Sequence, residues 1–285
     1  MSATTATAVQ LPDFVDLDFA RRLEMAETIL PDCVEALRRY APPDTIAVAE
    51  VAGGVAFFGG NDYPSNQMVG MGLYGEVTAD HLDRVEEFFH SRGVASTIVV
   101  SPLADASLPA LLGERGYRIV EFNAVLIRRI HHDEPLTAPP GVAVEQVTPD
   151  TVRPWMQAIA KGFSQEIPVA EEIFGAFASL PGALAFLVRI DGEVVGGCVG
   201  QIIPVARIAA LSGMSTLPEY RRRGVQSALI ARRLHEAALA GCEYAVVSTH
   251  PGSGSQRNME RRGFRVAYTK VVMRREWPEM EAPGG

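Results

Sequence analysis

The chain has 285 residues, of which 47% are apolar and 21% charged, so it is long enough for two domains with apolar cores. No apolar run approaches the roughly 18 to 20 residues of a membrane span, and no basic segment followed by an apolar stretch predicts a secretory signal. The formal net charge of -8 argues against nucleic acid as a partner, because affinity for the phosphate backbone depends on clustered Lys and Arg.

The three cysteines of the chain are widely spaced, at Cys33, Cys198 and Cys242. This spacing fits neither a disulfide framework nor a metal cluster, and a reducing compartment suits such thiols. We therefore expect a cytoplasmic protein that binds no metal, membrane or nucleic acid. A homodimer is compatible with these features.

The first half of the chain predicts an opening helical region followed by strands and helices. The segment from Phe14 to Tyr40 is amphipathic with helical periodicity, and we expect it to bury a face between two halves of the protein. Residues Gln67 to Tyr74 favour a strand, and residues Ala79 to Ser91 favour a helix.

Two pairs of segments recur at the same spacing along the chain. Ile98 to Ser101 matches Ala245 to Ser248, and Arg115 to Ile119 matches Arg262 to Val266, both with an offset of 147 residues (98 to 245, 115 to 262). In each copy a β-branched run is followed by turns, a short helical segment ending at glycine and a second apolar run. The chain is therefore predicted to contain two structural copies.

The boundary between the copies is predicted in a proline-rich stretch without periodicity, residues 131–141. We divide the chain into an N-terminal domain, residues 1–134, and a C-terminal domain, residues 141–280. The adjacent His131 and His132 have no third ligand at metal-binding spacing, so they are interpreted as solvated linker residues.

The C-terminal copy has an irregular order of helices and strands. We expect a strand at 142–147, two helices across about 151–180, strands at 183–189, 194–203 and 208–216, a helix at 227–240, a strand at 244–249, a helix at 255–262 and strands across 264–274. This order predicts an α+β fold rather than the regular alternation of a doubly wound sheet.

The segment between the strand ending at Thr216 and the following helix has the features of a phosphate site. Pro218 ends the strand, Gly224 removes a Cβ where a phosphate would approach the main chain, and the arginines at 221–223 add positive charge. The unsatisfied N–H groups and dipole of a helix N-terminus favour an anion there. A diphosphate is the expected ligand, and the plainer alternative is a solvated, arginine-rich turn.

The sequence Leu-Pro-Glu-Tyr-Arg-Arg-Arg-Gly-Val at 217–225 resembles the GNAT N-acetyltransferase superfamily, whose signature is Gln/Arg-x-x-Gly-x-Gly/Ala. Arg262-Gly263-Phe264 is similar to the Leu-Gly-Phe ending common in that family. The resemblance covers roughly residues 141–275 and departs from the signature at Gln226, where the family has Gly or Ala. It implies two GNAT-like domains in tandem, each a mixed, mostly antiparallel sheet flanked by helices and containing a splayed pair of parallel strands.

The resemblance implies that acetyl-coenzyme A is the acyl donor and that its pantetheine arm enters between the strands at 208–216 and 244–249. Main-chain groups at 214–216 would pair with the pantetheine amides. The expected coenzyme-binding residues are Met214, Ser215, Thr216, Arg221, Arg222, Arg223, Gly224, Val225, Gln226, Ser227, Ser255 and Asn258.

Few catalytic side chains are expected, because direct attack of an amine on a thioester in a ternary complex gains most from proximity and orientation. The tyrosine that many relatives use as an acid is replaced by Met259, which cannot donate a proton. The candidates are His250 as base, Tyr268, Ser253, Ser255 or Asn258 as acid, and Glu166 as an amine-binding carboxylate or a base acting through water. Each also has a plainer interpretation as an ordinary surface, strand or loop residue, and Ser253 is interpreted first as a helix cap.

The corresponding loop of the N-terminal copy is Gly75 to Thr78, which lacks Arg-x-x-Gly and carries Glu76, a residue that would repel phosphate. We therefore predict a degenerate N-terminal copy that supports the fold or forms one wall of the acceptor pocket. The predicted function is transfer of an acetyl group from acetyl-coenzyme A to a primary amine of a small molecule or peptide. The alternative is a non-catalytic acyl-coenzyme A sensor or partner-binding module.

Overall fold

A computed structural model of the protein describes residues 15–28, 31–40, 45–61, 63, 65–163 and 177–277. The elements of its first half are α1 (Leu17–Met25), α2 (Pro31–Tyr40), β1 (Ala47–Val51), β2 (Gly54–Phe58), β3 (Gln67–Val69), α3 (Ala79–His90), β4 (Ser96–Val100), α4 (Ser107–Glu114) and β5 (Arg118–Arg129). The strand predicted at Gln67 to Tyr74 is too long. It ends at Val69 because Gly70 and Gly72 adopt left-handed backbone angles, with φ of +82° and +81°.

The elements of the second half are β6 (Ala143–Gln146), α5 (Val152–Gly162), β7 (Phe186–Ile190), β8 (Glu193–Ile203), η1 (Pro204–Ala206), β9 (Ile208–Thr216), η2 (Pro218–Tyr220), α7 (Val225–Leu239), β10 (Tyr244–Thr249), α8 (Gly254–Glu260) and β11 (Arg265–Arg275). The strands expected at 183–189 and 194–203 form a β-hairpin of β7 and β8, and Asp191 and Gly192 in its turn both have positive φ. The expected strands across 264–274 form one continuous strand with two register shifts. Much of the second helix predicted before residue 180 lies outside the described residues.

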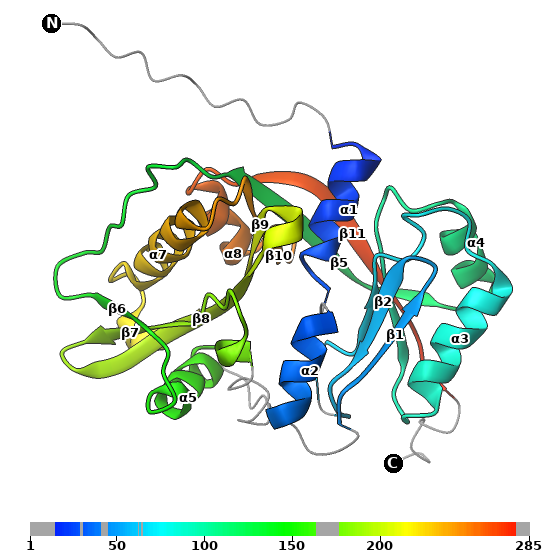
Figure 1. The fold of residues 1–285 in the computed structure, drawn as a ribbon, viewed down its shortest axis with the longest axis horizontal. Helices are drawn as coiled ribbons and strands as arrows, with labels where there is room; N and C mark the ends of the chain where they lie inside the picture. The colour runs from blue at the N-terminus through cyan, green and yellow to red at the C-terminus, as the bar shows by residue number, and fades with distance from the viewer. Residues whose placement is uncertain are drawn as a thin grey trace, which may run out of the picture.

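The strands of the described residues form one mixed sheet in the order β1-β2-β3-β4-β11-β5-β10-β9-β8-β7-β6 (Figure 1). Two neighbouring pairs are parallel, β3 with β4 and β9 with β10, and the others are antiparallel. Each parallel pair belongs to one of the two repeated segments. The expected α+β class, with a mostly antiparallel sheet and a parallel pair in each copy, is confirmed.

The last strand of each copy pairs with the sheet of the other copy. Strand β5 lies between β11 and β10, and β11 lies between β4 and β5. The two copies therefore share a single sheet across the boundary predicted at 134–141. That boundary separates two sequence repeats, and the division of the chain into domains at this point stays a prediction.

The opening helix α1 packs against strands from both copies. Phe19 and Leu23 lie in one apolar cluster with Ile127 of β5 and with Tyr244 and Val246 of β10. In Figure 1, α1 and α2 lie between the two halves of the molecule, while α3 and α4 cover one half and α7 and α8 the other. The expected burial of this segment between the halves is confirmed for the described residues.

The linker between the copies is anchored rather than simply solvated. Glu134 is buried, its carboxylate accepts hydrogen bonds from the Arg128 guanidinium at 2.9 and 3.0 Å, and its carbonyl oxygen lies 3.0 Å from His235 Nδ1. The prediction of a freely solvated linker is therefore corrected at this position, because the buried carboxylate needs a cationic partner. Of the two adjacent histidines, His132 is exposed and His131 partly so.

No helix in the described part of the chain is long and apolar enough to cross a membrane. Across the same residues, no group of three or more His, Cys, Asp or Glu side chains could hold a metal ion.

Candidate active site

Strands β9 and β10 separate partway along their length. They pair at three positions, Tyr244 with Ile208, Ala245 with Ala209 and Val246 with Ala210, although β9 continues to Thr216 and β10 to Thr249. Beyond this point, β9 stays paired with β8 and β10 stays paired with β5. The predicted splayed pair is thus present, and each strand is held in place from its far side.

The open edge of β9 carries main-chain groups that can pair with an extended ligand. Leu217 N donates to Val195 O of β8 at 2.9 Å, so the alternation of an antiparallel ladder directs the main-chain groups of Ser215 toward β8 as well. The groups of Met214 and Thr216 then point into the gap. Of the three residues predicted to pair with pantetheine, the ladder geometry supports Met214 and Thr216.

A β-bulge interrupts β9 at Gly213, which has no partner on β8. The fully buried Arg233 of α7 donates to Val199 O at 3.4 Å and to Ser212 O at 3.2 Å, on the two strands beside the bulge. Burial lowers the pKa of this guanidinium, since charge is disfavoured away from water. Arg233 therefore fixes the shape of β9 where the strands part, a role that its sequence position in an amphipathic helix did not indicate.

The N-terminus of α7 has no side-chain cap. Gly224 is its N-cap residue, and the first intrahelical bond runs from Ala228 N to Gly224 O at 3.0 Å, so the preceding N–H groups of the first turn point out of the helix end. By contrast, Thr78 and His81 cap α3 reciprocally, side chain to backbone. Of these two equivalent helices, α3 has a side-chain cap and α7 has none, so the first turn of α7 is the more open to an anion, in agreement with the single predicted coenzyme loop.

Gly224 has a reason to be glycine besides the one inferred from the sequence. Its φ is +84°, and a Cβ at this position would lie 2.5 Å from Cγ of Pro139 in the linker. The left-handed backbone and the packed proline thus favour glycine, and the explanation by close approach of a phosphate stays a prediction.

The three arginines of the loop have different partners. Arg221 donates to Gly162 O at 3.0 Å and to Thr216 O at 3.4 Å, so it joins the end of α5 to the end of β9. The Arg223 guanidinium lies 5.3 Å from the ring centre of Tyr220 and 3.8 Å from the Asp191 carboxylate. Arg222 is exposed with a φ of +63°. Arg222 and Arg223 are therefore the better placed of the three to meet a phosphate.

Gln226, which departs from the family signature, is turned toward α8. Its amide oxygen accepts a hydrogen bond from Asn258 Nδ2 at 2.8 Å, and Arg262 donates to the hydroxyl of the adjacent Ser227. These contacts join the first turn of α7 to α8, and they give Asn258 a structural role beside the predicted loop.

Two of the serines considered in the sequence, Ser253 and Ser255, lie at the start of α8 and differ in their contacts. Ser253 is the N-cap and accepts from Gln256 N at 3.1 Å, which confirms its interpretation as a cap. Ser255 is exposed. Met259 is buried in the core and takes the place of the usual acid with a packing role.

Two threonine hydroxyls mark the ends of the separated strands. Thr216 Oγ1 ends β9 and Thr249 Oγ1 ends β10, and both are buried without a hydrogen-bond partner among the described residues. A buried hydroxyl without a partner is costly, and a polar ligand in the gap would satisfy both. The residues therefore fit an amide-bearing arm such as that of pantetheine.

Replacement of either threonine hydroxyl by a methyl group is expected to weaken the binding of coenzyme A without lowering the melting temperature. The variants T216V and T249V should bind coenzyme A about threefold to tenfold more weakly, since each loses one hydrogen bond. Their melting temperatures should equal or exceed that of the parent, because a methyl group replaces an unsatisfied polar atom. Calorimetry with coenzyme A and thermal unfolding measure the two effects, and unchanged affinity in both variants would contradict the assignment.

Among the predicted catalytic residues, His250 and Tyr268 lie in the described part of the chain and have separate partners. His250 is 71% exposed, with Nδ1 3.5 Å from the Glu121 carboxylate. Tyr268 is buried and donates to Glu24 Oε1 at 2.7 Å, and burial raises its pKa far above the ordinary value, so it is poorly suited to donate a proton. Glu166 lies outside the described residues.

A cavity of about 440 Å³ lies beside the separated strands, with walls from both copies. The C-terminal copy contributes Leu211 to Gly213 of β9 and Val246 to Ser248 of β10, while the N-terminal copy contributes Val55 and Phe57 of β2 and Glu27. The expectation that the N-terminal copy forms one wall of a pocket agrees with this geometry. Glu27 was not predicted as a site residue, because a glutamate in an amphipathic segment normally faces solvent.

An opened parallel strand pair, orphaned hydroxyls along it and an uncapped helix N-terminus together suit a long ligand with an anionic end. Residues 150–264 match the model of the acetyltransferase (GNAT) family, so this part of the chain is a GNAT-family domain. For this domain, the family match suggests acyl transfer from an acyl-coenzyme A as the class of reaction.

Similar solved structures extend the likeness to nearly the whole chain. They include a GCN5-related N-acetyltransferase from Kribbella flavida, with 19% identity, a TM-score of 0.64 and coverage of 93% of this chain and 96% of that one. Another from Sphaerobacter thermophilus has 19% identity, a TM-score of 0.59 and coverage of 94% and 97%. A tandem GNAT protein from the clavulanic acid biosynthesis pathway has 15% identity, a TM-score of 0.58 and coverage of 91% and 93%. These likenesses show a shared fold, and no curated protein sequence matches this chain.

Proposed function

We propose that the protein is an N-acyltransferase that moves the acetyl group of acetyl-coenzyme A to a primary amine in a ternary complex. The observation that carries the proposal is the gap between β9 and β10, which leads from the uncapped start of α7 to the cavity of about 440 Å³. A donor bound in the gap would present its thioester beside an acceptor in the cavity. Both substrates would then be held for direct attack, the arrangement that gains most from proximity.

The C-terminal copy supplies the donor site in this proposal. Amides of the first turn of α7 bind the pyrophosphate, with Arg222 and Arg223 beside them, and the open edge of β9 binds the pantetheine arm. The N-terminal copy binds no coenzyme at α3 in this proposal, because Thr78 and His81 cap that helix end and the loop before it carries Glu76 in place of arginines. One coenzyme per chain is the expected stoichiometry by calorimetry.

A carboxylate introduced at the start of α7 should weaken the binding of coenzyme A without destabilising the fold. In Q226E, Asn258 can still donate to the side chain, and a negative charge at a helix N-terminus is favourable for the helix. Two unit charges about 6 Å apart repel by roughly 3 kcal/mol at an effective dielectric of about 20, so after screening coenzyme A should bind about ten- to hundredfold more weakly.

The matched control is A79E, which places the same charge in the first turn of the equivalent helix α3. Coenzyme affinity in this variant should equal that of the parent. Equal losses in Q226E and A79E would indicate a general charge effect, and no loss in Q226E would contradict a pyrophosphate site at α7.

A non-catalytic acyl-coenzyme A sensor is the second candidate, favoured by the burial of Met259 where relatives have an acid. Thiol release from acetyl-coenzyme A across an amine panel distinguishes the two. Binding with release above the hydrolysis rate supports the transferase, and binding without release on any amine supports the sensor.

A further inference from the structure

Two cavities meet at Glu27, Ser65, Gln67 and Ser248. The larger one lies at the separated strands and is mainly apolar. The smaller one, of about 260 Å³, is mainly polar, with Lys270 and Arg274 among its walls. Glu27 comes from the N-terminal copy, so an acceptor at this junction would touch both copies of the chain.

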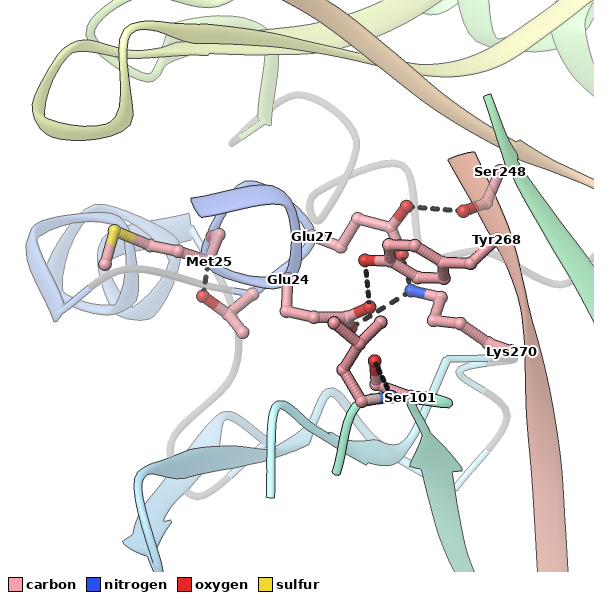
Figure 2. Close-up of polar contacts among 9 residues, drawn as sticks. Glu24, Met25, Glu27, Ser101, Ser248, Tyr268 and Lys270 are labelled. Atoms are coloured by element: carbon pink, nitrogen blue, oxygen red, sulfur yellow. Dashed lines mark hydrogen bonds and ion pairs between the residues drawn. The ribbon is translucent and has the colours of Figure 1, made fainter. Parts of the chain in front are cut away.

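The Glu27 carboxylate is held by one donor on each oxygen. Ser248, near the end of β10, donates to Oε1, and Lys270 of β11 donates to Oε2. Figure 2 shows Glu27 between these two side chains, with Glu24 and Tyr268 beside them. The Glu27 side chain remains 21% exposed, so the cavity reaches it although it is fixed in place.

Lys270 is buried between two carboxylates. Its Nζ lies 3.2 Å from Glu24 Oε2 and also donates to Glu27, while Tyr268 donates to Glu24 Oε1 at 2.7 Å. Burial raises the pKa of Glu24, and for Lys270 the attraction of the two glutamates outweighs burial and raises the pKa above its ordinary value. One cation is thus shared by two acidic groups, and Glu27 is the one that faces the cavities.

We propose that Glu27 binds the ammonium group of the acceptor and removes its proton, which makes the N-terminal copy the source of a catalytic residue. The inference rests on the proposed acyltransfer. An N–H proton of the ammonium passes to Glu27, and the freed lone pair forms a bond to the acyl carbon of the thioester. The C–S bond then breaks, a second proton passes from the nitrogen to the leaving sulfur, and Glu27 releases its proton to water.

The walls of the larger cavity define the class of acceptor. Its apolar side chains include Val55, Phe57, Leu180, Leu211 and Val246, and Glu27 is its one acidic group among the described residues. A single carboxylate in an apolar chamber fits a compact primary amine with one positive charge and a hydrocarbon or aromatic body. A polyamine would leave further charges against apolar walls.

The test uses the full chain, its E27Q variant and acetyl-coenzyme A, with 2-phenylethylamine, hexylamine and spermidine as probes. The introduced amide has no charge, but its oxygen can accept from Lys270 and its nitrogen can donate to the Ser248 hydroxyl, so the fold should persist. The variant should acetylate the two apolar amines with kcat/KM about 100-fold below the parent, the scale of a lost general base. Its coenzyme affinity by calorimetry should be unchanged, and E27D, which keeps the carboxylate, should recover part of the activity.

The matched control is D18N, which removes a carboxylate that is 84% exposed and paired with Arg21 on α1, the helix just before Glu27. Its activity should equal that of the parent. Equal activity of E27Q and the parent would overturn the role of Glu27 while leaving the transferase intact, and a preference for spermidine would overturn the acceptor class. Coenzyme binding without acetylation of any amine would overturn this inference together with the proposed transfer, and absence of coenzyme binding would refute the donor site itself.

Discussion

Residues 141–280 expressed alone are expected to lack a stable fold. In the full chain β11 pairs with β5 along most of its length and with β4 on its other edge, and both partners belong to residues 1–134. In the isolated segment, β10 would also lose its partner strand β5, whose Leu126 is fully buried in the C-terminal core of the full chain. The isolated segment would expose apolar strands and unpaired edges, which favour aggregation.

Circular dichroism, amide NMR dispersion and size-exclusion chromatography measure this outcome. The control is the full chain with a protease site in the exposed linker stretch at Leu136 and Thr137, cleaved after folding. The two fragments should stay associated, because the shared sheet needs no covalent link. A monomeric, well-dispersed 141–280 segment that binds coenzyme A with the parent's affinity would show that the copies are independent domains.

Replacement of Lys270 should cost about 3 to 5 kcal/mol of unfolding free energy, the usual scale for a buried ion pair that loses one partner. In K270M the side chain keeps its bulk, but Glu24 and Glu27 lose their shared cation in a buried setting. The control is K161M, at the exposed end of α5, which should change stability by less than about 0.5 kcal/mol. Chemical denaturation at pH 8 checks both values.

The loss in K270M should shrink as the pH falls from 8 to 5. Burial raises the pKa of Glu24 in the folded state above the ordinary value of 4.5, so folding favours its protonated form. The resulting stability is full below the unfolded pKa and is lost as the pH rises through the folded pKa. Without Lys270 the stability gained from protonating Glu24 at low pH grows. A loss in K270M at pH 5 equal to or larger than the loss at pH 8 would contradict a charged Glu24 at pH 8.

Much of the fold could be predicted from local pattern. The bounds of β9 and β10 were predicted correctly, because each is a β-branched or apolar run closed by a turn before a proline, at Pro218 and Pro251. The strand exchange could not be predicted, because β5 and β11 have similar patterns and nothing in either sequence says which copy supplies its partner. Repetition predicts the order of elements but leaves the pairing to tertiary packing.

The donor loop was found because its chemistry lies within a few consecutive residues, as at Arg222 and Gly224. The proposed acceptor side was not predicted, because it is assembled from residues that lie far apart in the sequence. Glu27 and Lys270 are 243 positions apart in the chain, and each has an ordinary local context, an amphipathic helix or a strand. The signal that could have found them is a lysine directly before the apolar run Val271 to Met273, because a lysine buried with such a run requires an acidic partner.

The strand exchange also determines which residues control the width of the gap between β9 and β10. One side of the gap rests on β8, and the other rests on β5 through β10. The opening through which a thioester would pass is therefore bordered by parts of the chain on opposite sides of the linker. To accommodate a longer acyl chain, an engineer would begin with the strand from Ala124 to Ile127, far in sequence from the loop proposed to bind the phosphates.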